Sequence, residues 1–210
     1  IFPQWSADGQ SLVFESIHPR EIREVPVAGG SPRTLYRPPA QSDYYTSVGR
    51  DGRILFMEAA AGGAKLEALN PRTGNTQDLA TLAAGFEAQL CWSPDQRQVA
   101  YETPAGIALT DFHGPARQIF AGRAGLACTP GGVYALQAKP DLSAVLWKIP
   151  WNGAGPTQVS TAIQPLWDLN YQDVGVGNYF AISPDGRQAV FQVEPQPSAN
   201  LGLLTQAPNP

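Results

Sequence analysis

The sequence predicts an all-β protein, a β-propeller of about five four-stranded antiparallel blades in which the last blade lacks its outer strand. Three observations predict it. A turn pattern returns along the chain, as in "WSADGQ", "WSPDQR" and "ISPDGR". An apolar segment of strand length follows each turn, and further short strand-like segments follow that one. Four antiparallel strands in about 40 residues are typical of one propeller blade.

The first element of each repeat is a short strand that ends in a tight turn. In Ser-Pro-Asp-Gly, proline fixes φ for the second position of a type I turn, aspartate suits the third, and glycine takes the positive φ that follows. The turn position is occupied in chain order by Asp8, Asp51, Asp95, Gly131 and Asp185. The apolar residues that precede the turns are Trp5, Val48, Trp92, Cys128 and Ile182.

Residue composition predicts the second, third and fourth strands of the repeats. The segments after the turns are rich in β-branched and aromatic residues, and each is closed by a large apolar residue: Phe14, Phe56, Tyr101, Leu136 and Phe191. Third strands such as "IREVPV" and "LWKIPW" lead through Gly- or Asn-bearing turns into fourth strands such as "RTLY" and "RQIFA". The fifth repeat ends in "QAPNP", where no fourth strand is expected.

These repeats predict a single propeller domain or a fragment of one. The expected blades cover residues 1–37, 43–81, 86–121, 124–160 and 177–206, with a long loop at 161–178. A β-sandwich is the alternative, but its strands would not repeat in groups of four. Since Ile1 leads directly into an inner strand, we expect an incomplete ring or the last five blades of a larger propeller, rather than a ring closed by a three-stranded blade.

The turn residues carry a family resemblance. Trp92-Ser93-Pro94-Asp95, and Ser183-Pro184-Asp185-Gly186-Arg187 before an apolar strand, resemble the WD40-like (PD40) propeller repeat of the TolB type. The blade endings "VPVAGGSPRTL" and "IPWNGAGPTQV" are similar to that family as well. Blade 2 and blade 4 depart from the motif with Gly49-Arg50-Asp51-Gly52 and Cys128-Thr129-Pro130-Gly131. The motif therefore indicates packing and turns more than a shared binding site.

The resemblance implies a scaffold in a larger bacterial protein. Proteins of this kind include periplasmic propellers, sensory propellers of bacterial regulators and kinases, and non-catalytic propeller domains of prolyl-oligopeptidase-like peptidases. It favours a periplasmic or extracytoplasmic location over the cytoplasm. A chain that begins at Ile1 is also expected to derive from a longer one.

Composition argues against two kinds of partner. Charged residues make up 15% of the chain and the formal net charge is −4, so a basic surface for nucleic acid is hard to build. No apolar run approaches the roughly 18 residues that a membrane-spanning helix needs. We therefore expect neither nucleic-acid binding nor membrane insertion.

No catalytic or metal motif stands out. His18 and His113 lie in expected turns without the closely spaced partners of a zinc site. The segment "DLNYQD" at 168–173 lacks the remaining ligands of a calcium loop. We therefore expect no cofactor, no metal and no enzymatic activity.

The two cysteines are expected to be buried free thiols. Cys128 occupies the apolar column before a turn, whereas Cys91 precedes that column by one residue. Because stacked sheets lie about 10 Å apart and a disulfide needs Cα atoms within roughly 7 Å, a bridge would require the narrow part of a wedge.

Aromatic and acidic residues gather on the links between blades, and loops of this kind carry function. The candidate binding residues are Tyr44, Tyr45, Phe86, Trp167, Asp168, Tyr171 and Asp173. They would suit a protein or peptide, or a small ligand at the hub. The competing interpretation is that most of these aromatics seal the hub.

The sequence thus predicts a non-enzymatic interaction or ligand-sensing module. The alternatives are a non-catalytic propeller domain of a prolyl-oligopeptidase-like hydrolase and a propeller enzyme that acts on glycans.

Overall fold

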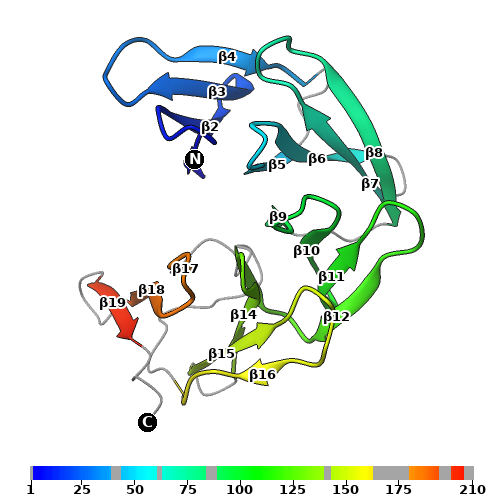
Figure 1. Ribbon diagram of the computed structural model, residues 1–210, viewed down its shortest axis with the longest axis vertical. Coiled ribbons are helices and arrows are strands. Elements are labelled where there is room, and N and C mark those ends of the chain that lie inside the picture. Colours follow the sequence, from blue (N-terminus) through cyan, green and yellow to red (C-terminus); the bar gives the residue numbers. More distant parts are fainter. Residues whose placement is uncertain are drawn as a thin grey trace. The chain divides into compact units, whose positions relative to one another are not determined.

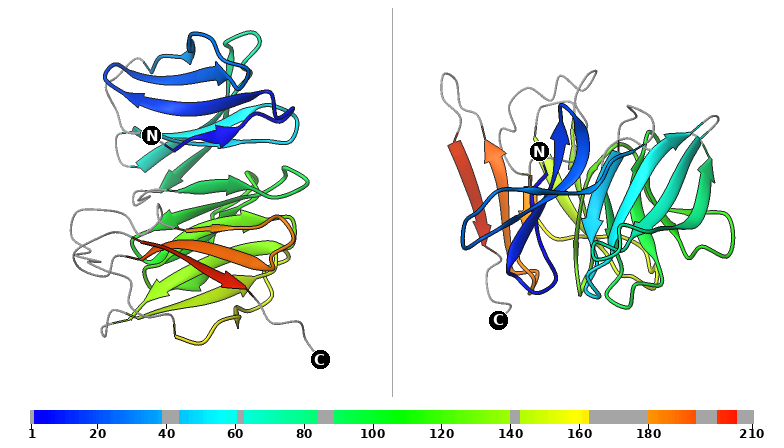
Figure 2. Two further views of the ribbon diagram at one scale, coloured as in Figure 1. Left: turned by 90° about the vertical axis from the view of Figure 1, so that its left-hand side faces the viewer. Right: turned by 90° about the horizontal axis from the view of Figure 1, so that it is seen from above.

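The computed structural model describes residues 2–38, 44–60, 63–83, 89–139, 143–162, 180–193 and 200–205. Every regular element in these ranges is a β-strand, and the strands form five separate antiparallel sheets (Figures 1 and 2). No helix in the described part of the chain is long and apolar enough to cross a membrane.

Each sheet corresponds to one predicted repeat, and we call the sheets blades 1 to 5. Four of them have four strands, and blade 5 has three. Blade 1 comprises β1 (Gln4–Trp5), β2 (Ser11–Ile17), β3 (Arg20–Pro26) and β4 (Arg33–Tyr36). Blade 2 comprises β5 (Tyr44–Val48), β6 (Ile54–Ala60), β7 (Gly63–Leu69) and β8 (Thr76–Ala83). Blade 3 comprises β9 (Leu90–Trp92), β10 (Val99–Thr103), β11 (Gly106–Thr110) and β12 (Arg117–Ala121).

The last two blades follow the same strand order. Blade 4 comprises β13 (Gly125–Thr129), β14 (Gly132–Ala138), β15 (Ala144–Ile149) and β16 (Thr157–Gln158). Blade 5 comprises β17 (Phe180–Ile182), β18 (Gln188–Val193) and β19 (Asn200–Thr205). In every sheet the order in space equals the order in sequence, so each blade is a simple meander.

The predicted turn is present and its chemistry is visible. In blade 1 the Ser6 hydroxyl donates to Asp8 Oδ1 at 2.7 Å and accepts a hydrogen bond from the backbone N–H of Ser11 at 2.9 Å. The same pair of bonds recurs at Ser93 and at Ser183. In blade 1 the left-handed position of the turn is occupied by Gly9, where φ is 68°. In blade 3 it is occupied by a non-glycine residue, Gln96, where φ is 57°.

The strand register corrects one predicted equivalence between the repeats of this chain. Trp5 pairs with Leu12 and Ile182 with Ala189, seven residues apart, whereas Cys128 pairs with Val133, only five residues away. The turn of blade 4 is therefore two residues shorter. As a result Ala135, and not the predicted Leu136, is the register equivalent of Phe14 and Phe191.

The chain forms two compact units, each with its own core. Unit 1 consists of residues 1–86, 90–99 and 111–115, and unit 2 consists of residues 87–89, 100–110 and 116–210. In unit 1, Val13, Ile22 and Leu35 of blade 1 form one buried cluster with Ile54, Phe56 and Leu69 of blade 2. Neighbouring blades in this unit are thus joined by a shared apolar layer.

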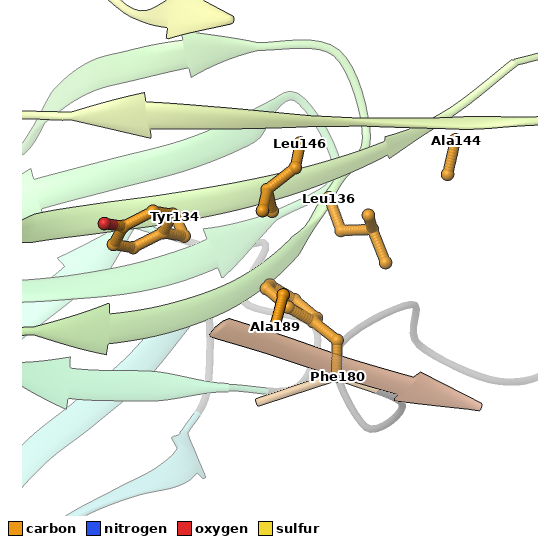
Figure 3. Close-up of a cluster of buried hydrophobic side chains, with 6 residues drawn as sticks. All are labelled: Tyr134, Leu136, Ala144, Leu146, Phe180 and Ala189. Atoms are coloured by element: carbon orange, nitrogen blue, oxygen red, sulfur yellow. The ribbon is translucent and has the colours of Figure 1, made fainter. Parts of the chain in front are cut away.

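Unit 2 repeats this arrangement. Tyr134, Leu136, Ala144 and Leu146 of blade 4 form a buried cluster with Phe180 and Ala189 of blade 5. Figure 3 shows Phe180 and Ala189 together on one side of the cluster, with Leu136 and Leu146 on the other. Burial of side chains of this size contributes about 1.5–3 kcal/mol each.

The expectation of free thiols is wrong. Cys91 and Cys128 are both disulfide-bonded, and the chain has no other cysteine. The spacing of about 10 Å that argued against a bridge holds for flat stacked sheets. Both residues lie on the first strand of their blades, β9 and β13.

Candidate functional site

The predicted binding residues lie largely outside the described ranges. Tyr45 lies in β5, and Tyr44 begins the same strand. The remaining candidates are outside the described residues: Phe86, Trp167, Asp168, Tyr171 and Asp173. The structure therefore places one side chain of the set, and it does not test the others.

Tyr45 packs on another aromatic ring. Its ring centroid lies 5.8 Å from that of Phe2, with the two planes tilted by 51°. Both side chains are half-buried. This geometry is a normal aromatic packing contact, and it agrees with the interpretation in which Tyr45 helps to seal the interior.

Two buried carboxylates join successive blades, and the sequence analysis missed them. Glu15 Oε1 on β2 accepts a hydrogen bond from Thr46 Oγ1 on β5 at 2.9 Å. Glu102 on β10 accepts one from the backbone N–H of Leu126 on β13 at 2.7 Å. The two glutamates are 4% and 3% exposed. Each one therefore fixes the second strand of its blade to the first strand of the next blade.

A sequence signal for these carboxylates existed. Glu15 directly follows Phe14, and Glu102 directly follows Tyr101, so in two of the five repeats an acidic residue follows the large apolar residue of the second strand. An acidic side chain recurring inside an apolar strand is notable because carboxylates are rarely buried without partners.

Burial also changes the chemistry of Glu15. Removal from water raises its pKa from 4.5 to about 7, and hydrogen bonds from Thr46 oppose that rise. A carboxyl group with such a pKa is one mark of a reactive site. Here, however, its partners are a threonine side chain and backbone of the adjacent strand, as expected for a structural link.

The other buried carboxylates are held at the outer strands. Glu21 on β3 accepts hydrogen bonds from Thr34 Oγ1 at 2.8 Å and from Arg37. Glu67 on β7 pairs with Lys65 at 3.3 Å, and burial raises the pKa of Glu67. Glu21 and Glu67 each bind partners within their own blade. The four buried glutamates of the described residues therefore have separate sets of partners.

The turns of blades 2 and 3 form a second polar cluster. The Arg53 guanidinium lies over the Trp92 ring, 5.5 Å from its centroid, and the Phe112 ring meets that indole edge-on at 6.0 Å. Asp51 binds Arg53 through its Oδ2 atom and accepts a hydrogen bond from Gln96 Nε2 at 2.8 Å. This cluster covers Trp92, which is 8% exposed.

Trp5 occupies the same repeat position as Trp92 but is 60% exposed. From its place in the repeat, Trp5 was expected to be an ordinary packing residue. Trp5 is the most exposed large apolar side chain among the described residues.

Among the described residues, no group of three or more His, Cys, Asp or Glu side chains is arranged to hold a metal ion. His18 and His113 are exposed, and the backbone N–H of His113 donates to Asp111 at 3.1 Å.

Sequence comparison finds no protein-family model and no curated protein that match the chain. Comparison of structures finds propellers. TolB from Acinetobacter baumannii is similar with a TM-score of 0.75 and 13% identity over 98% of this chain and 51% of its own. A TolB-type protein from Agrobacterium tumefaciens has a TM-score of 0.71 and 17% identity over 97% of this chain and 76% of its own.

An enzyme of the same architecture is also similar. Oligogalacturonate lyase from Vibrio parahaemolyticus has a TM-score of 0.68 and 13% identity over 97% of this chain and 62% of its own. The chain spans about half the length of the Acinetobacter protein. At these identities the likeness shows the fold alone: a β-propeller whose structural neighbours include the TolB type.

Proposed function

We propose that the chain is a non-enzymatic propeller scaffold that binds a protein or peptide through the links between its blades. The observation that carries the proposal is that the buried carboxylates bind groups of the sheets themselves. Glu15, Glu21, Glu67 and Glu102 each bind strands or side chains of the sheets. A hydrolytic or lyase site would instead need acidic groups converging on one place.

The aromatic links supply the proposed binding surface. Tyr45 presents a half-buried ring at the start of blade 2, and Trp167 and Tyr171 belong to the longest link in the sequence. Rigid aromatic side chains give a large contact area at low entropic cost, so they are favoured where peptides bind.

The test is peptide selection on the immobilised 210-residue chain. We expect enriched peptides whose affinity falls at least about tenfold in a Trp167→Ala/Tyr171→Ala double variant. Arg97→Ala is the matched control, because Arg97 is exposed in the turn after β9 and does not belong to a link between blades, and it should leave the affinity unchanged. Peptides that bind all three proteins equally would contradict the proposed surface.

A second arm addresses the enzymatic alternative, which the likeness to oligogalacturonate lyase motivates. The chain is incubated with oligogalacturonate, with and without manganese, and the products are followed by mass spectrometry. We expect no turnover above buffer. Turnover that disappears in an Asp168→Asn/Asp173→Asn variant would replace the scaffold proposal with a glycan-active one.

A further inference from the structure

The first turn of blade 4 lacks the carboxylate that the other first turns contain. In blades 1, 3 and 5 the Oδ1 atom of the turn aspartate accepts hydrogen bonds from a serine hydroxyl and from the backbone N–H two residues further along. Counted from the first strand of each blade, the turn aspartates are Asp8, Asp51, Asp95 and Asp185, whereas blade 4 has Gly131 at this place. Blade 4 therefore lacks the anion around which the other turns are built.

A lysine lies where the missing side chain would project. A Cβ atom added to Gly131 would be 3.5 Å from Lys148 Nζ and 3.7 Å from Thr129 Oγ1. Lys148 belongs to β15 and Thr129 ends β13. Gly131 is exposed and Lys148 is half-buried. An ammonium group and a hydroxyl group thus lie beside the place that an aspartate takes in the other blades.

Lys148 is held in position by an aromatic ring. It pairs with Tyr134 in the strand register, and its Nζ atom lies 5.8 Å from the centroid of the Tyr134 ring, as in a cation–π contact. Tyr134 is 3% exposed and belongs to the core cluster of blades 4 and 5, and Figure 3 shows its hydroxyl end pointing away from the rest of that cluster. Among the described residues, no carboxylate forms an ion pair with Lys148. The ammonium group is therefore fixed beside Gly131 without an anion from the described part of the chain.

The Thr129 hydroxyl has only a weak acceptor. It accepts a hydrogen bond from the backbone N–H of Gly131 at 3.1 Å and donates to the backbone oxygen of Gly132 at 3.4 Å. A good O–H···O bond is shorter than about 3.0 Å. The equivalent serine hydroxyls donate to a carboxylate at 2.7, 2.6 and 2.5 Å. Because bonds to an ionised acceptor are stronger than neutral ones, Thr129 would donate to a carboxylate in preference to the Gly132 carbonyl.

From these contacts we propose that Lys148 Nζ and Thr129 Oγ1 form a binding site for an external carboxylate group, that of an acidic peptide segment or of a small carboxylic acid. The carboxylate would take the place of the turn aspartate. One of its oxygens would accept from the threonine hydroxyl, as Asp95 accepts from Ser93, and the ammonium group would neutralise its charge. The site is separate from the links between the blades, so it goes beyond the proposed function and does not rest on it.

The test is an NMR titration of the isotope-labelled 210-residue chain at constant ionic strength in chloride buffer. The probes are sodium acetate and a peptide of alternating glycine and aspartate, and the backbone N–H signals of Gly131 and Gly132 report binding. We expect saturable shifts, and the same peptide with asparagine in place of aspartate should bind at least about tenfold more weakly. Tighter binding of the peptide than of acetate, per carboxylate, assigns the site to an acidic peptide segment, and equal binding assigns it to a small carboxylic acid.

Variants of the site separate charge from shape. Gly131→Asp supplies a carboxylate from the chain itself, and the nearest contact of its Cβ atom, 3.5 Å, is an ordinary one. It should weaken binding of the probes at least about tenfold more than Gly131→Ala does. Lys148→Gln should abolish the shifts, and Lys148→Arg should restore them. The matched control is Arg187→Gln, because Arg187 is an exposed cation in a turn that keeps its aspartate, Asp185.

Three results would overturn the proposal. The first is the absence of saturable shifts with both carboxylate probes. The second is equal binding of the aspartate and asparagine peptides. The third is an equal effect of Gly131→Asp and Gly131→Ala, which decides the question even if Lys148→Gln fails to fold. The Trp167→Ala/Tyr171→Ala variant should bind the acidic probes as the wild type does, so failure of this site and failure of the proposed function are distinguishable.

Discussion

Ser93 shows how a single hydroxyl specifies the repeated turn. It donates to Asp95 Oδ1 at 2.6 Å and accepts from the backbone N–H of Gln98 at 3.0 Å. The same donated bond holds the pKa of Asp95 below its ordinary value. Ser93 itself is 3% exposed, whereas Asp95 is exposed.

Replacement of Ser93 should therefore have two measurable effects. We expect Ser93→Ala to lower the free energy of unfolding by about 1–2 kcal/mol, because a backbone donor loses its acceptor. We also expect the pKa of Asp95 to rise toward its usual value. Urea unfolding and a carboxyl NMR titration measure the two. Thr73→Ala is the control, because Thr73 accepts only one long bond at an exposed turn. An unchanged Asp95 pKa would contradict the role given to the hydroxyl.

Glu15 makes stability depend on pH. Its pKa is about 7 in the folded chain, against an ordinary value of 4.5. The folded state thus holds its proton more tightly than the unfolded state, so folding is favoured at low pH. This contribution is complete below pH 4.5 and is lost as pH rises to about 7. The shift corresponds to about 3 kcal/mol.

Glu15→Gln should remove this dependence while keeping an acceptor for Thr46. We expect the free energy of unfolding of the wild type to fall by about 3 kcal/mol more than that of the variant between pH 4.5 and pH 8. Urea titrations across that range measure the difference. Glu24→Gln is the matched control on the neighbouring strand, where Glu24 pairs with Arg33 at the surface. Parallel pH profiles for wild type and Glu15→Gln would refute the assignment.

At the scale of elements, the disulfide between the only two cysteines should be a main source of stability. It joins β9 to β13 and closes a loop of about 38 residues, for which chain entropy predicts roughly 4 kcal/mol, with 2–4 kcal/mol typical of measurements. We expect reductant to lower the Tm of the wild type and to have no effect on a Cys91→Ser/Cys128→Ser variant. A wild-type melt that is insensitive to reductant, with thiol titration confirming reduction, would contradict this.

The elements themselves could be predicted from sequence because their signals are local. Turn chemistry at Ser6, Ser93 and Ser183 specifies the first hairpin of blades 1, 3 and 5, and strand composition specifies most other strands. The prediction that Leu136 is equivalent to Phe14 was wrong because the shorter turn of blade 4 changes the strand register. The sequence alone does not show that change. The cysteine prediction failed because pairing depends on the distance between blades. The candidate site on the links lacks any local signal that orients Trp167 or Tyr171.

At the scale of the whole molecule, a propeller is a series of blades that cannot bury their faces alone. Each face that lacks a neighbour is an apolar surface, and the face with Trp5, Leu12 and Phe14 is one. Such surfaces promote association when nothing covers them. The 210-residue chain should therefore self-associate.

This association should be concentration-dependent and specific to the face that carries Trp5, Leu12 and Phe14. Light scattering of the 210-residue chain should show an average mass that rises with concentration above that of a monomer. Trp5→Glu should weaken the association at least about tenfold, because a buried carboxylate at the contact would lose its hydration. Val27→Glu is the informative control: Val27 is also exposed, at 53%, but it lies in the turn beyond β3, outside the paired face. If both variants weaken association equally, general surface charge rather than the Trp5 face governs association. If neither variant does, Trp5 lies outside the contact.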